Sequence, residues 1–155
     1  MFEIRRASHS DSQTAFDIRL LAIRHQCIGA YSETQLLAWT AGAADDGYYT
    51  LMEKHFYLGC MDGEPVATGM LDLENSEIGA IFVHPGFMQQ GIGGRILKHL
   101  ECLARELGLK EVKLDATLNA ADFYRRCGFV GEEPAIYHSP SGLQLACIPM
   151  VKRFL

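Results

Sequence analysis

The stretch from residue 77 to residue 107 decides the fold, and it reads EIGAIFVHPGFMQQGIGGRILKHLECLAREL. It begins with an apolar run, 78–83, of the length and composition typical of a buried strand. Pro85 interrupts that run, and Gly91–Gly94 then precedes a segment with the apolar spacing of an amphipathic helix. A helix N-terminus after a glycine-rich turn binds anions, because its first N–H groups lack partners and its dipole favours negative charge. We therefore predict that this turn binds the diphosphate of a cofactor.

Length and composition indicate one soluble domain that spans residues 1–155. A chain of 155 residues buries roughly 70% of its unfolded surface. The hydrophobic fraction of 48% and the charged fraction of 21% are ordinary. The net charge, 14 − 19 = −5, argues against general binding to nucleic acid, which needs a basic surface. No signal-peptide pattern and no membrane-length apolar run occur, so we expect a cytoplasmic protein with no membrane partner.

The cysteine pattern argues against a disulfide framework and against a metal site. The five cysteines are an odd number, and no two are separated by only two residues. We expect small buried apolar side chains in a reducing compartment, and no bound metal.

The pattern along the whole chain predicts an α+β fold, with a mixed, mostly antiparallel central sheet flanked by helices. A first strand begins at Phe2, and capping boxes at Ser10–Gln13 and Ser32–Gln35 each open a helix. Residues 41–47 are small and polar, as in a loop. The further strands are expected at 55–61, 66–73, from 78, 112–116, from 129, and 143–151, with a short helix after residues 119–122. The hairpin turn between the second and third strands is Asp62-Gly63.

Two connections carry topological information. The helix after the glycines is a crossover between two strands, so those strands should pair in parallel. Pro149 lies inside the last expected strand and lacks an N–H donor, so this strand should be an edge strand or contain a bulge.

Two common phosphate-binding patterns do not fit the glycine turn. A Walker loop needs lysine and then serine or threonine after its last glycine, but Gly94 and Arg95 follow Gly93. A dinucleotide fingerprint needs a third glycine where Ile96 stands, and a strand that leads directly into the turn.

A third pattern fits. Residues 83–97, VHPGFMQQGIGGRIL, closely resemble the coenzyme A-binding motif of the GNAT superfamily of N-acetyltransferases. Residues 119–129, NAADFYRRCGF, resemble the closing signature of that superfamily, and the expected order of strands matches as well. The resemblance implies an enzyme that moves an acetyl group from acetyl-CoA directly to a primary amine of a small molecule or a protein.

The resemblance also implies roles for single residues. Tyr124 would protonate the departing coenzyme A thiolate as general acid, and Asn119 would hydrogen-bond the cofactor near the pantetheine. Met88 stands where the superfamily usually has glutamine or arginine. The backbone of one strand would pair with the pantetheine arm at Ile81, Phe82 and Val83. The pyrophosphate would bind the N–H groups of Gln89, Gln90, Gly91, Ile92, Gly93 and Gly94.

The general base and the acceptor are less constrained by the sequence. Glu77 opens the central strand and is our candidate for the base, with Asp72 and Glu74 as alternatives. The segments around 29–47 and 137–142 should shape the acceptor pocket, and the acidic balance favours a cationic acceptor such as an amine or polyamine.

Two other functions and one assembly stay open at this point. A coenzyme A-binding sensor without efficient turnover would keep the cofactor site but would not need Tyr124 or a base. A nucleotide-binding domain would bind NAD or ATP instead of coenzyme A. A homodimer through the C-terminal strands is possible.

Overall fold

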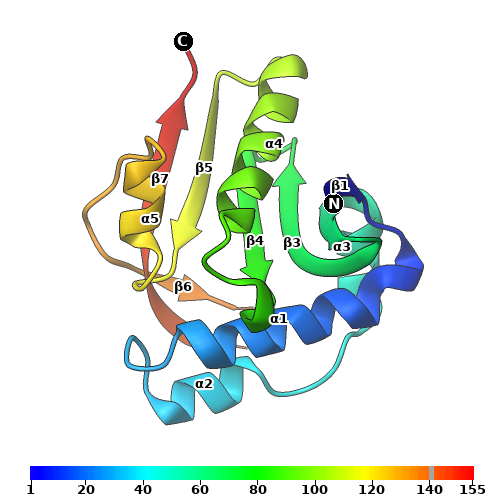
Figure 1. Ribbon diagram of the computed structural model, residues 1–155. Coiled ribbons are helices and arrows are strands. Elements are labelled where there is room, and N and C mark those ends of the chain that lie inside the picture. Colours follow the sequence, from blue (N-terminus) through cyan, green and yellow to red (C-terminus); the bar gives the residue numbers. More distant parts are fainter. Residues whose placement is uncertain (140–141) are drawn as a thin grey trace.

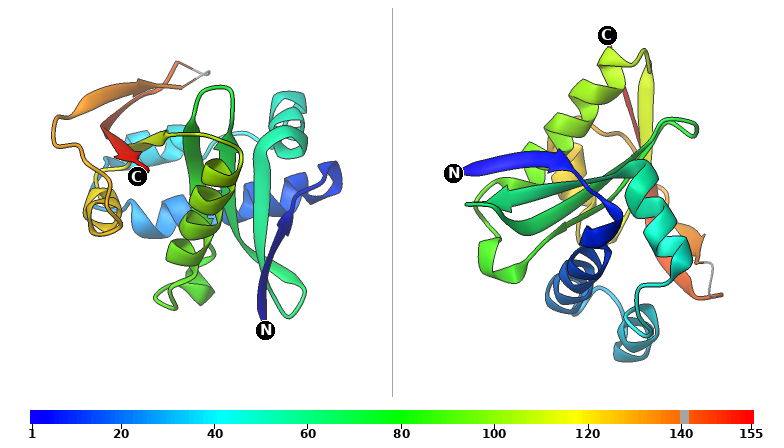
Figure 2. Two further views of the ribbon diagram at one scale, coloured as in Figure 1. Left: turned by 90° about the horizontal axis from the view of Figure 1, so that it is seen from above. Right: turned by 90° about the vertical axis from the view of Figure 1, so that its right-hand side faces the viewer.

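The computed structural model describes residues 1–139 and 142–155, and it contains a seven-stranded sheet with helices on both faces (Figures 1 and 2). The strand order is β1-β2-β3-β4-β5-β7-β6. Every neighbouring pair is antiparallel except β4 and β5, which are parallel. The strands are β1 (Phe2–Arg6), β2 (Phe56–Met61), β3 (Glu64–Asp72), β4 (Glu77–Val83), β5 (Glu111–Ala116), β6 (Ala135–His138) and β7 (Gln144–Arg153). This is the α+β fold with a mostly antiparallel sheet that the sequence predicts.

The helices form two layers. α4 and α5 pack on one face of the sheet in the largest apolar cluster, and α1, α2 and α3 pack on the other face in two smaller clusters (Figure 2). The helices are α1 (Ser12–Gln26), α2 (Glu33–Trp39), α3 (Asp46–His55), α4 (Ile92–Glu106) and α5 (Ala121–Arg126), with single 3₁₀ turns at His9–Asp11 and Pro85–Phe87. Among the described residues, none of these helices is long and apolar enough to cross a membrane.

The amphipathic pattern of α4 is confirmed, and a glycine in the sheet explains its close packing. Ile96, Leu97 and Leu100 are almost completely buried against the sheet. A Cβ at Gly69 in β3 would lie 2.5 Å from Cγ2 of Ile96. A side chain at this position would therefore push α4 away from the sheet.

Three local predictions need correction. Residues 46–55 form helix α3, which overlaps the end of the loop expected at 41–47 and the start of the strand expected at 55–61; Asp45 caps the helix by accepting from the N–H of Tyr48. The first capping box is formed by Ser8 and Asp11 at the 3₁₀ turn, not by Ser10–Gln13. The expected strand from Phe129 is only an isolated bridge between Val130 and Val151, and the strand itself starts at Ala135.

Pro149 lies in β7, which is not an edge strand; the way in which β7 accommodates this proline is not indicated by the sequence. β7 lies between β5 and β6, but β6 pairs only with Gln144–Cys147 and β5 only with Ile148–Arg153. Pro149 therefore pairs with β5 alone, and its missing N–H costs no ladder hydrogen bond on the other side.

The two parallel strands diverge, and this divergence positions the site. Glu77 and Lys113 are the one register pair between β4 and β5 in the described residues. Beyond this pair the strands separate toward their carboxyl ends (Figure 1). α4 begins at Ile92, near the carboxyl end of β4 and nine residues after Val83 in the chain, so the glycine turn and the opening in the sheet are neighbours.

Candidate active site

A cavity of about 770 Å³ occupies the opening between β4 and β5. Its walls come from β4, from β5 and the segment after it, from α1 and α3, and from the C-terminal hairpin. Five of the residues that the sequence singles out line this one cavity: Glu77, Ile81, Phe82, Asn119 and Tyr124. Tyr31 and Trp39, from the acceptor segment expected at 29–47, line it as well.

The backbone of β4 is irregular where it borders the cavity. The register jumps from Met70–Gly79 to Thr68–Phe82, so Ala80 and Ile81 together face Gly69 in a β-bulge. Ala80 has a φ of 51°, which is rare for a residue with a Cβ. A bulge leaves backbone groups outside the ladder, and these groups border the cavity.

The glycine turn has the geometry of an anion site. Gln89 and Gly91 both have left-handed backbone, with φ of 62° and 77°, and Gly91 is the N-cap of α4. The N–H groups of the first turn of α4, at 92–94, have no partner within the helix. A Cβ built on Gly91 or Gly94 would meet no heavy atom within 4 Å. The turn therefore combines open space with N–H groups that have no helical partner, and a diphosphate needs both, so the turn fits the cofactor that the sequence implies.

Met88 lies just before this turn, in extended backbone and half-buried. Arg95, in the first turn of α4, lies over the ring of Phe2 at 4.5 Å from its centroid. The first turn of α4 therefore offers a phosphate chiefly backbone N–H groups.

Tyr124 lies in α5, where its ring packs edge-on against Phe123 and Phe129. Burial raises the pKa of the Tyr124 phenol, and the nearby Cys127 raises it further. The phenol therefore stays protonated at neutral pH, which a proton donor requires.

Glu77 lies at the start of β4, opposite Asp72 of β3 in the ladder. Burial raises the pKa of the Glu77 carboxyl; Asp115 and Asp72 add to this effect and Lys113 opposes it. A carboxylate with a raised pKa in a cavity has the property expected of a general base. Of the two alternatives, Asp72 also lines the cavity and Glu74 does not.

The remaining sequence candidates lie around the cavity. The amide of Asn119 interacts with the thiol of Cys27, whose pKa burial raises to about 11. Val83 and residues 89–94 lie outside the cavity lining, at the end of β4 and the start of α4. Of the loop expected at 137–142, Tyr137 belongs to β6, while residues 140–141 lie outside the described residues.

Arg19, Tyr48 and Asp115 also line the cavity, and sequence reasoning does not single them out. They come from α1, α3 and β5, and only the fold brings them together. Asp115 carries a local signal, because it precedes the end of the strand that pairs with β4.

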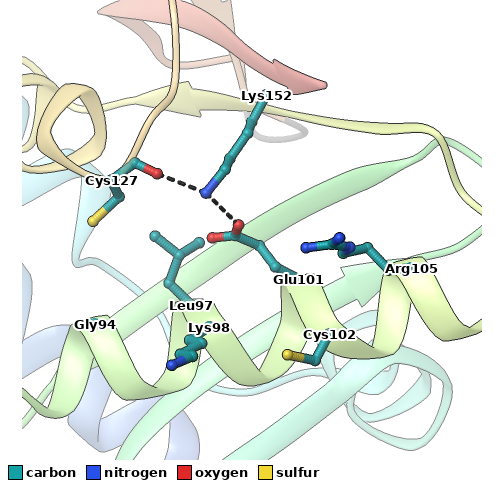
Figure 3. Close-up of a pocket in the computed structure, with 8 residues that line it drawn as sticks. All are labelled: Gly94, Leu97, Lys98, Glu101, Cys102, Arg105, Cys127 and Lys152. Atoms are coloured by element: carbon teal, nitrogen blue, oxygen red, sulfur yellow. Dashed lines mark hydrogen bonds and ion pairs between the residues drawn. The ribbon is translucent and has the colours of Figure 1, made fainter. Parts of the chain in front are cut away.

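A second hollow, of about 360 Å³, lies along the outer side of α4 between Gly94 and Arg105 (Figure 3). Lys152 of β7 reaches across it, donating to the carbonyl oxygen of Cys127 at 2.7 Å and pairing with Glu101 at 2.6 Å. The expectation of buried cysteines holds for Cys27, Cys60 and Cys147 but is wrong for Cys102, which is exposed beside this hollow. In residues 1–139 and 142–155, no group of three or more His, Cys, Asp or Glu side chains could hold a metal ion.

Comparisons with known proteins agree with this geometry. The model of the acetyltransferase (GNAT) family matches residues 16–129. A GCN5-related N-acetyltransferase from Rhodopseudomonas palustris, described as "Aminotransferase, Class-II", is similar in structure with a TM-score of 0.89 at 25% identity, covering 98% of this chain and 95% of that one. No curated protein sequence matches the chain significantly.

Two more distant structures share the fold. The PaiA N-acetyltransferase of Thermoplasma acidophilum, solved in complex with coenzyme A, has a TM-score of 0.75 at 18% identity, with 99% of each chain covered. The ribosomal-protein-S18-alanine N-acetyltransferase of Escherichia coli has a TM-score of 0.67 at 21% identity, with 99% of this chain and 94% of that one covered. Because the family match covers well over half of the 155 residues, the chain belongs to the acetyltransferase (GNAT) family and is an acetyl-CoA-dependent N-acetyltransferase.

Proposed function

We propose that this chain transfers the acetyl group of acetyl-CoA directly to a primary amine, with Glu77 as general base and Tyr124 as general acid. One observation carries the proposal: these two side chains, one from β4 and one from α5, line the same cavity. Their pKa values are both raised, which suits a carboxylate that accepts a proton and a phenol that keeps one until it is needed.

Acetyl-CoA would bind across the two features described above. The N–H groups of 89–94 would hold the pyrophosphate, and the backbone of Ile81–Val83 would pair with the pantetheine as an added strand does. Asn119 would hydrogen-bond the same arm. The bulge at Ala80 supports this arrangement, because it leaves β4 backbone groups outside the ladder where they can polarise the thioester carbonyl.

The proposed reaction needs two proton transfers. The acceptor enters as an ammonium ion, and Glu77 takes one proton so that the nitrogen has a free lone pair. The nitrogen then forms a C–N bond to the acetyl carbon while the C–S bond breaks. The sulfur takes the proton of Tyr124, and the second proton lost by the nitrogen restores the phenol through solvent. The products are the N-acetyl amine, coenzyme A thiol and one released proton.

Thiol release with acetyl-CoA and a panel of amines tests this function. We expect release that requires both substrates, and initial-velocity lines that intersect, because direct transfer needs both substrates bound at once. Parallel lines would indicate an acetylated enzyme and contradict direct transfer. If no amine gives turnover while acetyl-CoA still raises the melting temperature, the chain is a coenzyme A sensor instead.

A further inference from the structure

Arg19 is the one arginine or lysine among the described residues that line the cavity. It lies on α1, with its guanidinium carbon 5.4 Å from the centroid of the Phe16 ring, and its Nη2 donates to the carbonyl oxygen of Trp39 at 3.2 Å. Among the residues that the structure describes, no carboxylate forms an ion pair with it. Burial lowers its pKa, so its positive charge is partly desolvated without a carboxylate partner.

A partly desolvated guanidinium costs free energy unless an anion compensates it. A guanidinium has five N–H donors in a planar fork that matches a carboxylate. Among residues 1–139 and 142–155, the hydrogen-bond acceptor of Arg19 is the carbonyl oxygen of Trp39. Because Arg19 lines the cavity, its other N–H donors are available to a carboxylate of a ligand bound there.

The sheet side of the same cavity carries acidic groups. Glu77 of β4 and Asp115 of β5 both line the cavity, and Asp115 raises the pKa of Glu77. Tyr137 connects this side with Arg19: burial raises the pKa of its phenol, Arg19 lowers it, and Glu77 and Asp115 raise it. The phenol of Tyr137 is therefore within electrostatic range of both the cation and the carboxylates.

We propose that the acceptor is a small amino acid-like molecule, with a carboxylate that binds Arg19 and an ammonium group that faces Glu77 and Asp115. This inference rests on the proposed function, and it narrows the acceptor from any primary amine to an amine that carries an anionic group. The acceptor's two charges would then match the two sides of the cavity. An amino acid-like acceptor takes the place of the polyamine that net charge alone favours, because the second ammonium group of a polyamine would lie against the positive charge of Arg19.

The test uses acceptors in matched pairs: amino acids of increasing length, and the carboxamide of each. With the best pair, we expect kcat/KM for the amino acid to exceed that for the carboxamide by about tenfold or more, as for a charge-assisted hydrogen bond. Arg19→Gln should raise KM for the amino acid by about 10- to 100-fold, while kcat/KM for the carboxamide stays unchanged. Arg24→Gln is the control, because Arg24 is exposed on the same helix and lies outside the cavity lining.

A second measurement is independent of turnover. Calorimetry in the presence of coenzyme A should show that the wild-type protein binds an N-acetyl amino acid more tightly than its amide, and that Arg19→Gln removes the difference.

Three outcomes overturn the inference while the proposed function stands. Carboxamides or diamines react as well as amino acids; Arg19→Gln lowers kcat/KM equally for the amino acid and its carboxamide; or Arg24→Gln changes KM for the amino acid as much as Arg19→Gln does. If no amine reacts, the proposed function fails, and equal binding of the acid and the amide then overturns this inference as well.

Discussion

The hydroxyl of Thr68 in β3 donates a 2.7 Å hydrogen bond to the carbonyl oxygen of Ala80 in β4. Thr68 is only 1% exposed, and Ala80 is the left-handed residue of the bulge beside the cavity. The hydrogen bond therefore holds the part of β4 that we expect to face the thioester.

Thr68→Val tests this relationship, since it keeps the shape of the side chain and removes the donor. It leaves the Ala80 carbonyl without this partner, and we expect a loss of about 1–2 kcal/mol in the free energy of unfolding. We also expect a higher KM for acetyl-CoA, because the bulge is no longer fixed. Urea unfolding and steady-state kinetics measure the two effects.

Thr50→Val is the matched control, since its hydroxyl also bonds a backbone carbonyl, that of Asp46 at 3.0 Å, but its side chain is exposed. Equal losses of stability in the two variants would show that the buried hydrogen bond to Ala80 contributes no more to stability than an exposed one.

The strand, the glycine turn and the helix at 77–107 could be predicted because each has a local signal. The same holds for the hairpin at Asp62-Gly63, where both residues have positive φ. Helix α3 could not be recognised, because Gly47 and the aromatic residues after it lower its helix propensity. Its one clear signal was the cap at Asp45.

Some residues of the candidate site could be predicted from the sequence and others could not. Tyr124 and the glycine turn were found through motifs that are continuous in the sequence. Arg19 and Tyr137 carry no such signal, because their meaning depends on α1 and β6 facing one cavity. Gly131 is similar: a Cβ there would lie 2.2 Å from the carbonyl oxygen of Pro149, a contact between segments that no local pattern indicates.

Gly91→Ala separates cofactor binding from backbone strain. The left-handed φ at this position should cost about 1 kcal/mol of stability in an alanine variant. The new methyl group would also occupy the space at the turn, so the Kd for coenzyme A should rise by about tenfold or more, the equivalent of about 1.4 kcal/mol.

Gly108→Ala is a close control at the other end of α4, with a φ of 90° and no heavy atom within 4 Å of its Cβ. It should lose similar stability and bind coenzyme A normally. Calorimetric titration decides the point, and equal affinities in the two variants would mean that the turn does not bind the diphosphate.

Glu77→Gln should have opposite effects on rate and on stability. The pKa of Glu77 is raised in the folded protein, so its charged form disfavours folding at pH above that pKa, and this penalty disappears as the pH falls through it. The variant should therefore be at least as stable as wild type at pH 7, while kcat falls by about 100-fold or more.

The pH dependence gives a second check on Glu77. In the wild type, kcat/KM should fall as the pH decreases through the raised pKa, because a protonated carboxyl cannot accept a proton. Glu74→Gln, on the exposed turn before β4, should leave the profile unchanged. A Glu77→Gln variant with a normal rate would identify another group, or a water molecule, as the base.

Glu101→Gln tests the contact that joins α4 to the C-terminal strand (Figure 3). The side chains of Glu101 and Lys152 are 13% and 28% exposed, so the ion pair is screened little by water. We expect a loss of about 1–3 kcal/mol on chemical denaturation. Glu111→Gln, which breaks the exposed pair with Arg153, should change stability by only about 0–1 kcal/mol, and a larger effect there would contradict this ranking.

The most direct test of the mechanism is the kinetics of Tyr124→Phe, measured as acetyl-CoA-dependent thiol release with a reactive amine, together with the Kd for coenzyme A. The ring packs against Phe123 and Phe129, and phenylalanine preserves that packing. We predict a fall in kcat of about 100-fold or more with an unchanged Kd. A variant that releases thiol at the wild-type rate would show that Tyr124 is not the general acid.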